Sequence, residues 1–301
     1  MAEPPLIVGM SVACIDELLV VPHMPLSDGT LRVSRRDRQG GGIAATAMVA
    51  ASRLGCRAAF IGAVGADPIG EEILEGLRAE GVDVSRVRID PDGRTNFSVV
   101  LVEEGTGKRS IIYWPGRVAP FRLEEDDLAR IRSAAGLLLD GHAIDPQLEA
   151  ARAARAAGVP TMLDGTRADP SLDPLIPWID ILVATRAFVR DISPGADLEE
   201  GLRALRAMGP REVVATAGEE GCWLLEDGGL WHQRAFPVEV VDTTGAGDVF
   251  HGAYLAARAS GRDPREACRF AAAAAALKCR DIGGRRAIPT RAELEAFLAR
   301  A

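Results

Sequence analysis

The chain of 301 residues has little of what marks secreted, membrane or nucleic-acid-binding proteins. Its five cysteines are an odd number without paired or metal-like spacing, and no apolar run is long enough to cross a membrane. Acidic residues outnumber basic residues by 43 to 35, so the formal charge is −8 and there is no global basic surface for nucleic acid. We therefore expect reduced thiols and neither a membrane nor a nucleic-acid partner. The cysteines are Cys14, Cys56, Cys222, Cys268 and Cys279.

The start of the chain also lacks a secretory signal. Residues 1–5, MAEPP, contain no basic region followed by an apolar run, so the expected location is the cytoplasm. Hydrophobic residues make up 48% of the chain, which is ample for one large α/β domain or two smaller ones. No repeat or low-complexity linker divides the sequence.

Apolar, β-rich runs alternate with helical runs along most of the chain. An apolar run at residues 6–12 is followed by a helical run at 44–54, an apolar run at 58–61 and a helical run at 69–80. This alternation predicts an α/β fold with a doubly wound parallel sheet and helices on both faces. Further strands are expected at 137–140, 160–163, 179–183, 212–216 and 222–225, and further helices at 147–157, 198–208, 249–259 and 265–279.

A few segments do not fit that wound sheet. Residues 17–22 and 30–36, and a hairpin-like pair at 96–102 and 109–114, have the pattern of antiparallel strands. They predict a second, smaller sheet. A surface hairpin without function is the alternative for the pair.

Residues 240–252, VVDTTGAGDVFHG, carry the strongest sign of chemistry. The run at 238–241 predicts a strand and residues from Val249 onward recur at helical spacing, so the glycines lie where a helix begins. The first amides of a helix lack partners, and small side chains let phosphate oxygens approach them. Asp248 can then accept the proton of an attacking hydroxyl, which indicates phosphoryl transfer from a nucleotide to an alcohol. The alternative is a structural turn capped by Thr244.

Residues 242–250 resemble the second signature of the ribokinase family, also called the PfkB carbohydrate kinases. That pattern is Asp-Thr-x-Gly-Ala-Gly-Asp followed by an aromatic residue, and the match is complete. Residues 40–47, 54–55 and 60–70 look like the family's first signature region in order and spacing. The resemblance covers nearly the whole chain, and two long signatures in the expected order are more specific than either alone.

The resemblance implies a ribokinase-like three-layer fold with a small β-sheet lid. It implies one kinase domain over residues 1–301, with lid strands from about 16–36 and 94–115 inserted in it. It also implies ATP as the phosphoryl donor, Mg²⁺ to neutralise the triphosphate, and a homodimer that forms through the lid sheet.

The resemblance and the proton-acceptor argument agree on the catalytic residues. Asp248 is the expected base that removes the proton from a sugar hydroxyl. The amides of Gly245, Ala246 and Gly247 would stabilise the charge that develops on the transferred group.

Two cation roles follow from the resemblance. Asp242 and Thr244 match positions that help to bind a monovalent cation such as K⁺ in some members, although a turn aspartate with a capping threonine is an equal alternative. The window at 184–187, Ala-Thr-Arg-Ala, lacks the Asn-x-x-Glu motif that organises water around Mg²⁺ in many members. The nucleotide and water would then hold Mg²⁺, with Asp164 as a candidate neighbour.

The nucleotide itself is expected at two segments. In the resemblance, the turn after the strand at 212–216 runs beside the phosphates, and small residues of the last long helix leave room for the adenine ring. Arg285 and Arg286 follow that helix, and both a phosphate contact and simple surface exposure are open for them. The expected nucleotide-binding residues are Thr216, Gly218, Gly221, Ala272, Ala276, Cys279 and Gly283.

Asp16 is the strongest candidate for holding the phosphoryl acceptor. It lies just past the first apolar strand, near the carboxyl edge of the sheet where α/β folds bind ligands, and a carboxylate can accept two hydrogen bonds from neighbouring hydroxyls. Gly41 and Gly42 would let the backbone approach the sugar. Thr46 and His142 complete the expected acceptor site.

Two departures from the family pattern concern the acceptor. Ile43 stands where the family commonly has asparagine, which argues against a ribose-like substrate. Residues 40–47 and 275–289 look closest to the sulfofructose kinases of the family. The positions that would bind a sulfonate there hold Thr30, Tyr113 and His142, none of which is a strong anion partner.

The sequence therefore predicts an ATP-dependent kinase of a small sugar or sugar derivative, with a ketohexose-like acceptor preferred. A nucleoside kinase of the same fold and a catalytically weak sugar or nucleotide sensor are the alternatives. A dinucleotide-dependent oxidoreductase is set aside, because residues 8–13 do not supply a Gly-x-Gly-x-x-Gly motif after the first strand.

Overall fold

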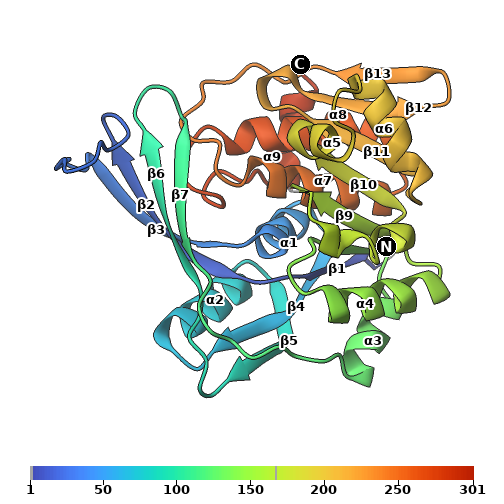
Figure 1. Cartoon of the computed structure of the whole chain (residues 1–301), viewed down its shortest axis with the longest axis horizontal. Helices are drawn as coiled ribbons and strands as arrows, with labels where there is room; N and C mark the ends of the chain where they lie inside the picture. The colour runs from blue at the N-terminus through green and yellow to red at the C-terminus, as the bar shows by residue number, and fades with distance from the viewer. Residues whose placement is uncertain (1–2, 167) are drawn as a thin grey trace.

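A computed structural model describes residues 3–166 and 168–301 of the chain. Its main body is a nine-stranded sheet in the order β13-β12-β11-β10-β9-β8-β1-β4-β5 (Figure 1). The strands from β11 to β5 in this order are parallel, whereas β12 pairs antiparallel with both β11 and β13. The strands are β1 (Leu6–Met10), β4 (Arg57–Gly65), β5 (Val82–Asp90), β8 (Gly136–Leu139), β9 (Thr161–Gly165), β10 (Ile181–Thr185), β11 (Glu212–Thr216), β12 (Cys222–Glu226) and β13 (Gly229–Gln233).

Helices cover both faces of this sheet, as the alternating sequence pattern predicts (Figure 1). Successive residues of a strand point to opposite faces, so Ile7 of β1 lies in one buried cluster while Val8 lies in the other. One cluster contains α1 (Ile43–Arg53), α2 (Pro68–Ala79), α7 (Ala246–Ala259), α8 (Pro264–Lys278) and α9 (Arg291–Leu298). The other contains α3 (Glu125–Arg132), α4 (Ile144–Ala156), α5 (Arg186–Ile192) and α6 (Leu198–Ala207).

A second sheet of four strands, here called the lid sheet, has the order β3-β2-β6-β7 and projects from one side of the main body (Figure 1). One of its faces, the inner face, packs Leu18, Val100 and Val102 against Ile282 of the segment after α8. The neighbouring residues of each strand point to the outer face. The strands are β2 (Cys14–Val21), β3 (Arg35–Gly41), β6 (Phe97–Glu103) and β7 (Arg109–Trp114).

The lid sheet differs in two respects from the prediction. The expected strand at 30–36 is mostly loop, and β3 covers Arg35–Gly41 instead. Its sequence RRDRQGG has little β propensity, but its arginines pair with acidic neighbours such as Glu17 on β2, and pairing of this kind is invisible in a propensity pattern. In addition, β2 and β6 run parallel rather than antiparallel.

The structure also differs from the prediction in other elements. Residues 238–241 form no strand, because Val240 and Val241 lie exposed in an irregular segment whose Val241 amide donates to the Cys279 carbonyl oxygen at 2.8 Å. The strands β5 and β13 and the helices α3, α5 and α9 were not anticipated. Within the described residues, no helix has the length and apolar character needed to cross a membrane.

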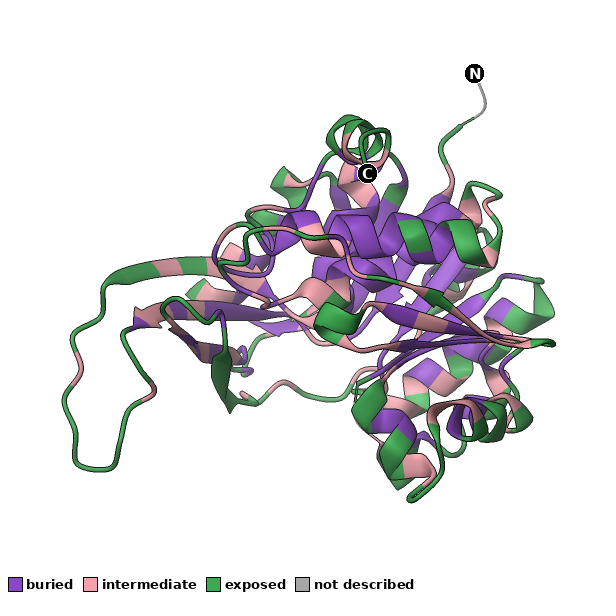
Figure 2. Ribbon diagram, turned by 90° about the horizontal axis from the view of Figure 1, so that it is seen from above, coloured by how far each residue is buried: buried purple, intermediate pink, exposed green. Residues whose placement is uncertain are grey.

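Buried residues are concentrated in the main sheet and the helices packed on it, whereas the loop at 22–34 beyond β2 is almost entirely exposed (Figure 2). Because β1, β8, β9, β10 and β11 are parallel neighbours, their carboxyl ends meet at one edge. The lid sheet begins directly after β1 and therefore starts at that same edge. Any site at this edge is built from the main sheet on one side and the lid on the other.

Candidate active site

The turn at 243–247 leads into α7 and leaves backbone amides open. Gly245 is the N-cap in the left-handed region with φ 73°, and a Cβ there would meet the Gly284 Cα at 2.7 Å, so only glycine fits. Within the part of the chain that the structure describes, no acceptor is found for the amides of Gly247 and Asp248. A Cβ on Gly247 would meet nothing within 4 Å, so the turn faces open space. The helix start therefore has the amides and the room that an oxyanion needs.

One of the three predicted amides is already used. The Ala246 amide donates to the Thr243 carbonyl oxygen at 3.2 Å, which closes the turn. Among the described residues, the amides of Gly245 and Gly247 have no acceptor, and the Asp248 amide is a further open donor that was not in the predicted set.

Asp248 is half-buried in the first turn of α7. Burial, together with the nearby carboxylate of Asp164, raises the pKa of Asp248 to about 7. A carboxylate with this pKa is a suitable proton acceptor near neutral pH.

His251, one turn further along α7, connects the helix to two strand ends. Its Nδ1 lies 2.6 Å from the Gly247 carbonyl oxygen and 3.2 Å from Asp164 Oδ2, and its Nε2 lies 3.1 Å from the Val183 carbonyl oxygen. Asp164 also accepts a hydrogen bond from the Thr166 hydroxyl. These contacts fix the start of α7 over the ends of β9 and β10.

The buried carboxylate of Asp242 organises the segment before the turn. Its Oδ1 accepts from the Thr244 amide at 2.8 Å and the Thr244 hydroxyl at 2.7 Å, and its Oδ2 accepts from the Gly283 amide at 2.7 Å. Its carbonyl oxygen accepts from Lys278 Nζ at 2.7 Å. Every oxygen of Asp242 is therefore already hydrogen-bonded within the chain.

Asp16 lies on the lid strand β2, rather than in a loop of the main sheet, and faces β3. It accepts a hydrogen bond from the Cys14 thiol at 3.5 Å, and burial raises its pKa. A Cβ on Gly41 would collide with its carboxylate, so glycine is needed there. Gly42, with φ 92°, is the N-cap of α1.

Arg285 is buried near the Asp16 carboxylate, so the alternative of a surface-exposed Arg285 is wrong. Its Nη2 donates to the Gly41 carbonyl oxygen at 2.8 Å, and its Nε donates to the hydroxyl of the buried Thr46 at 3.4 Å. Thr46 therefore contacts Arg285, which lies between α1 and the glycines. Arg286 is exposed and pairs with Asp37 of β3.

His142 follows β8 at the same edge of the sheet. Its Nδ1 lies 3.2 Å from Asp140 Oδ2, and this contact raises the pKa of His142. Asp140 is buried and also accepts from the Ser11 hydroxyl and, at 2.9 Å, from Gln147 Nε2. The imidazole is 45% exposed, so its other nitrogen is accessible from the edge.

Two lid residues contribute polar groups on the inner face. Arg109 Nη1 donates to the Thr243 hydroxyl oxygen at 2.7 Å, directly beside the turn into α7. Asn96 Nδ2 donates to the Tyr113 hydroxyl oxygen at 3.0 Å. The lid thus reaches the start of α7 through Arg109.

The predicted nucleotide residues lie in two places. The turn after β11 runs through a short 3₁₀ helix at Gly218–Glu220, in which Gly218 is exposed, while Gly221 has φ 95° and packs on the backbone of β13. Ala272 and Ala276 lie on α8, which packs against α7, and Cys279 is the C-cap of α8. The two places flank α7 from β11 and from α8.

Gly283 and Thr216 each donate a hydrogen bond within the chain. The Gly283 amide donates to Asp242, and a Cβ on Gly283 would collide with Gln39 of β3, so it ties the segment after α8 to the lid. The Thr216 hydroxyl donates to the Ala184 carbonyl oxygen at 3.3 Å.

The window at 184–187 holds no carboxylate for a metal. Thr185 caps α5 by accepting from the Phe188 amide at 3.1 Å, and Arg186 pairs with Glu220. Among the residues described, no three His, Cys, Asp or Glu side chains form a metal-binding group. Asp164 lies close to α7, because its Oδ2 is 3.2 Å from His251 Nδ1.

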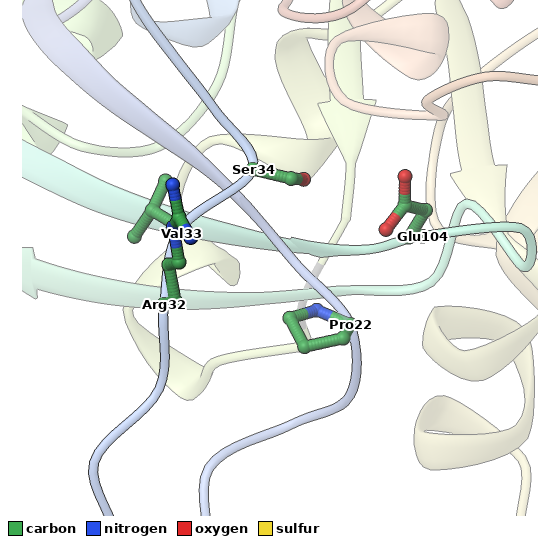
Figure 3. Close-up of a pocket in the computed structure, with 5 residues that line it drawn as sticks. All are labelled: Pro22, Arg32, Val33, Ser34 and Glu104. Atoms are coloured by element: carbon green, nitrogen blue, oxygen red, sulfur yellow. The ribbon is translucent and has the colours of Figure 1, made fainter.

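A hollow of about 340 Å³ lies at the far end of the lid (Figure 3). Pro22 follows Asp16 by six residues, roughly 20 Å along an extended strand, so this hollow is remote from Asp16. It is therefore not the site of the chemistry. Its lining residues are Pro22, Arg32, Val33, Ser34 and Glu104.

Comparison with known proteins decides the family. Residues 10–291 match the model of the pfkB family carbohydrate kinases. The chain belongs to the PfkB family. It is an ATP-dependent kinase of the sugar and nucleoside kinase class with the ribokinase-like fold.

Individual relatives agree with this assignment. The chain is 31% identical to a 2-dehydro-3-deoxygluconokinase of Thermoproteus tenax, over 91% of this chain and 90% of that protein. It is 29% identical to a ribokinase of Haemophilus influenzae (94% and 95%) and 28% identical to a nucleoside kinase of Methanothermobacter thermautotrophicus (97% and 95%).

Solved structures show the same fold over the whole chain. A putative ribokinase from Agrobacterium tumefaciens superposes with a TM-score of 0.90 at 31% identity, covering 99% of this chain and 98% of that one. The Arabidopsis thaliana ribokinase, solved with ribose and ATP, superposes with a TM-score of 0.87 at 29% identity, covering 99% of both chains.

Sequence reasoning did not anticipate several residues of this PfkB kinase site. His251 was not among the expected site residues, yet its spacing of four residues from Gly247 puts it on the same helix face and could have signalled the contact. Arg109 and Lys278 come from elements far away in sequence, and no local pattern reveals their contacts. The hydrogen bonds of Arg285 likewise depend on the tertiary fold.

Proposed function

We propose that this PfkB kinase transfers the γ-phosphoryl group of ATP directly to a hydroxyl of a small sugar or sugar derivative, with a ketohexose-like acceptor preferred. The single observation that carries the proposal is Asp248, whose pKa is about 7, next to the open amides of α7. A base and an anion pocket side by side are what in-line transfer to an alcohol requires.

Asp248 accepts the hydroxyl proton as the acceptor oxygen attacks the γ-phosphorus. The amides of Gly247 and Asp248 donate to the oxygens of the transferred group, with Gly245 keeping the turn in its left-handed form. Arg109 lies close enough to the turn, through Thr243, to offset negative charge there. The turn at 216–221 and the α8 residues line the nucleotide on either side.

Mg²⁺ supplies charge neutralisation of the triphosphate when bound, and the residues present fit a cation carried mainly by the nucleotide. Asp164 offers a single carboxylate near the pocket, and Mg²⁺ in nucleotide sites often takes only one or two protein carboxylates. Asp164 is thus the proposed protein partner of the nucleotide-bound ion.

The acceptor is proposed to lie between Asp16 and Asp248. Asp16 accepts hydrogen bonds from two neighbouring hydroxyls, and the absent side chains of Gly41 and Gly42 let the sugar approach. His142 donates from its accessible nitrogen. The half-buried Ile43, at the start of α1, offers no polar contact, which disfavours a ribose-like acceptor.

A nucleoside kinase is the second candidate, because a nucleoside kinase is among the relatives and the apolar Ile43 could contact a base. A weak sensor is the third. It is disfavoured by the retention of Asp248 with open amides, which a protein without turnover does not need.

The lid is proposed to form a homodimer interface. Its outer face exposes Ile112 (61%) and Trp114 (43%), beside the half-buried Leu19, Val99 and Leu101 of β2 and β6. An apolar sheet face of this kind is commonly covered by a partner. A cytoplasmic location remains part of the proposal.

The proposal is tested by ADP release from ATP and Mg²⁺ over a panel of ketohexoses, aldopentoses, deoxy-sugar acids, sulfofructose and nucleosides. An acceptor that stimulates ADP release by the wild type, with a ketohexose best, supports it. A nucleoside as the best acceptor favours the second candidate. No stimulation by any acceptor despite ATP binding favours the sensor.

A further inference from the structure

Lys278 is a buried charged residue that the proposed reaction does not use. It lies in the last turn of α8 with a relative exposure of 0%. The chain has only two lysines, and the other, Lys108, is exposed in the turn before β7. Fully buried lysines are rare because removing the ammonium from water is costly.

The surroundings of Lys278 connect it to the turn that begins α7. Its Nζ donates to the Asp242 carbonyl oxygen, and among residues 3–166 and 168–301 no second acceptor lies within hydrogen-bond distance. The amides of Val241 and Asp242 donate to the carbonyl oxygen of Cys279, the next residue after Lys278. The end of α8 therefore holds the segment that leads to Gly245.

Nearby negative charge favours the Lys278 ammonium in its buried position. Burial lowers the pKa of Lys278, and the carboxylates of Asp242 and Asp248 oppose this effect. A position in the last turn of α8 also favours a cation, because the helix dipole is negative there. Lys278 thus places positive charge against Asp242, in the segment that leads into the turn before α7.

A bound monovalent cation, which the family resemblance implies at Asp242 and Thr244, does not fit the residues present. Oδ1 of Asp242 already accepts two hydrogen bonds from Thr244, while Oδ2 and the carbonyl oxygen each accept one, from Gly283 and Lys278, so these oxygens have few lone pairs left for a cation. The ammonium would also repel a second cation at this point.

We propose that the Lys278 ammonium permanently supplies the positive charge that a monovalent cation would bring to the anion pocket, so that this kinase works without K⁺. The proposal rests on the proposed kinase function for its turnover measurement. Lys278 acts as a positioning residue through Asp242 and the turn, and does not contact the transferred group.

The first test needs no acceptor sugar. The Kd for ADP is measured by calorimetry at constant ionic strength in KCl and in tetramethylammonium chloride. The wild type is expected to bind ADP equally, within about twofold, in both salts. A tenfold gain in affinity or turnover in KCl would overturn the proposal. Because this arm does not depend on the acceptor, it stays informative if no substrate is found.

The second test uses Lys278→Met, which keeps the length of the side chain and removes its charge. In tetramethylammonium chloride its turnover is expected to fall about tenfold or more, with partial recovery in KCl or NH₄Cl. Lys108→Met is the matched control and should behave like the wild type in every salt. A folded Lys278→Met protein, checked by its thermal transition, with unchanged turnover or with a loss that neither cation relieves would contradict the proposal. If the variant fails to fold, the wild-type salt comparison decides.

Discussion

Arg109 of the lid and Thr243 of the turn before α7 are joined by a hydrogen bond of 2.7 Å between Nη1 and the hydroxyl oxygen. This contact links β7 to the segment that presents the open amides. The lid and the turn that begins α7 are therefore directly connected. Loss of the contact should affect both transfer and the exclusion of water.

Arg109→Ala is expected to lower kcat/KM by about tenfold or more, the size of one charge-assisted hydrogen bond. Because a closed lid excludes water, it should also raise acceptor-free ATP hydrolysis relative to transfer. ADP release with and without acceptor measures both effects. The exposed neighbour gives the control Lys108→Ala, which should leave both rates unchanged. An unaltered ratio of hydrolysis to transfer in Arg109→Ala would remove Arg109 from lid closure.

Asp16→Asn should weaken acceptor binding while leaving the nucleotide site intact. Losing a charged hydrogen-bond acceptor for sugar hydroxyls is expected to raise the acceptor KM by about 10- to 100-fold. The Kd for ADP should stay within about twofold. Glu104→Gln, which changes an exposed carboxylate in the turn between β6 and β7, is the control. If Asp16→Asn altered ADP affinity and not the acceptor KM, Asp16 would belong to another part of the site.

The pH dependence of the reaction should follow Asp248. Only its deprotonated form accepts a proton, so log(kcat/KM) should rise with a slope near 1 below pH 7 and level off above it. Initial rates from pH 5 to 9 at saturating ATP provide the profile. A flat profile between pH 5 and 8 would show that no group with a pKa near 7 acts as the base.

The free energy of unfolding should also depend on the ionisation of Asp248, but it should fall with rising pH where activity rises. The pKa of Asp248 is raised from 3.8 to about 7 by folding, so between about pH 4 and 7 the native state keeps a proton that the unfolded state releases, and stability falls as pH rises through this range. Asp248→Asn is therefore expected to be more stable than the wild type, by up to about 4 kcal/mol above pH 7 and by close to zero near pH 4. Chemical unfolding at several pH values measures the difference. A variant less stable than the wild type at pH 8 would contradict the burial of this charge.

The main sheet was predictable because its strands are apolar on both faces and its helices have clear periodicity. Leu6 to Met10 and Val213 to Ala215 are fully buried runs of this kind, and β11 was predicted with the correct bounds. The lid strand β3 was displaced in the prediction because its stability comes from pairing and from salt bridges such as Arg38 with Glu17. Those partners are distant in sequence, so periodicity cannot identify them.

The residues of the candidate site also fall into those that the sequence predicts and those that depend on tertiary packing. Asp248 and the glycines before it were recognisable because the turn into a helix is local in sequence. Ala246 could not be excluded as a free donor, since its hydrogen bond to Thr243 depends on the left-handed Gly245. The burial of Arg285 and Lys278 depends on the packing of α8 against the turn and the lid, which the sequence does not display.

The central claim, that Asp248 is the base of phosphoryl transfer, is tested most directly by the turnover of Asp248→Asn with the best acceptor. Its Kd for ADP is measured alongside, to check that the nucleotide site is intact. The account predicts a fall in kcat of about 10²- to 10⁴-fold with ADP binding retained. Turnover close to that of the wild type would contradict it.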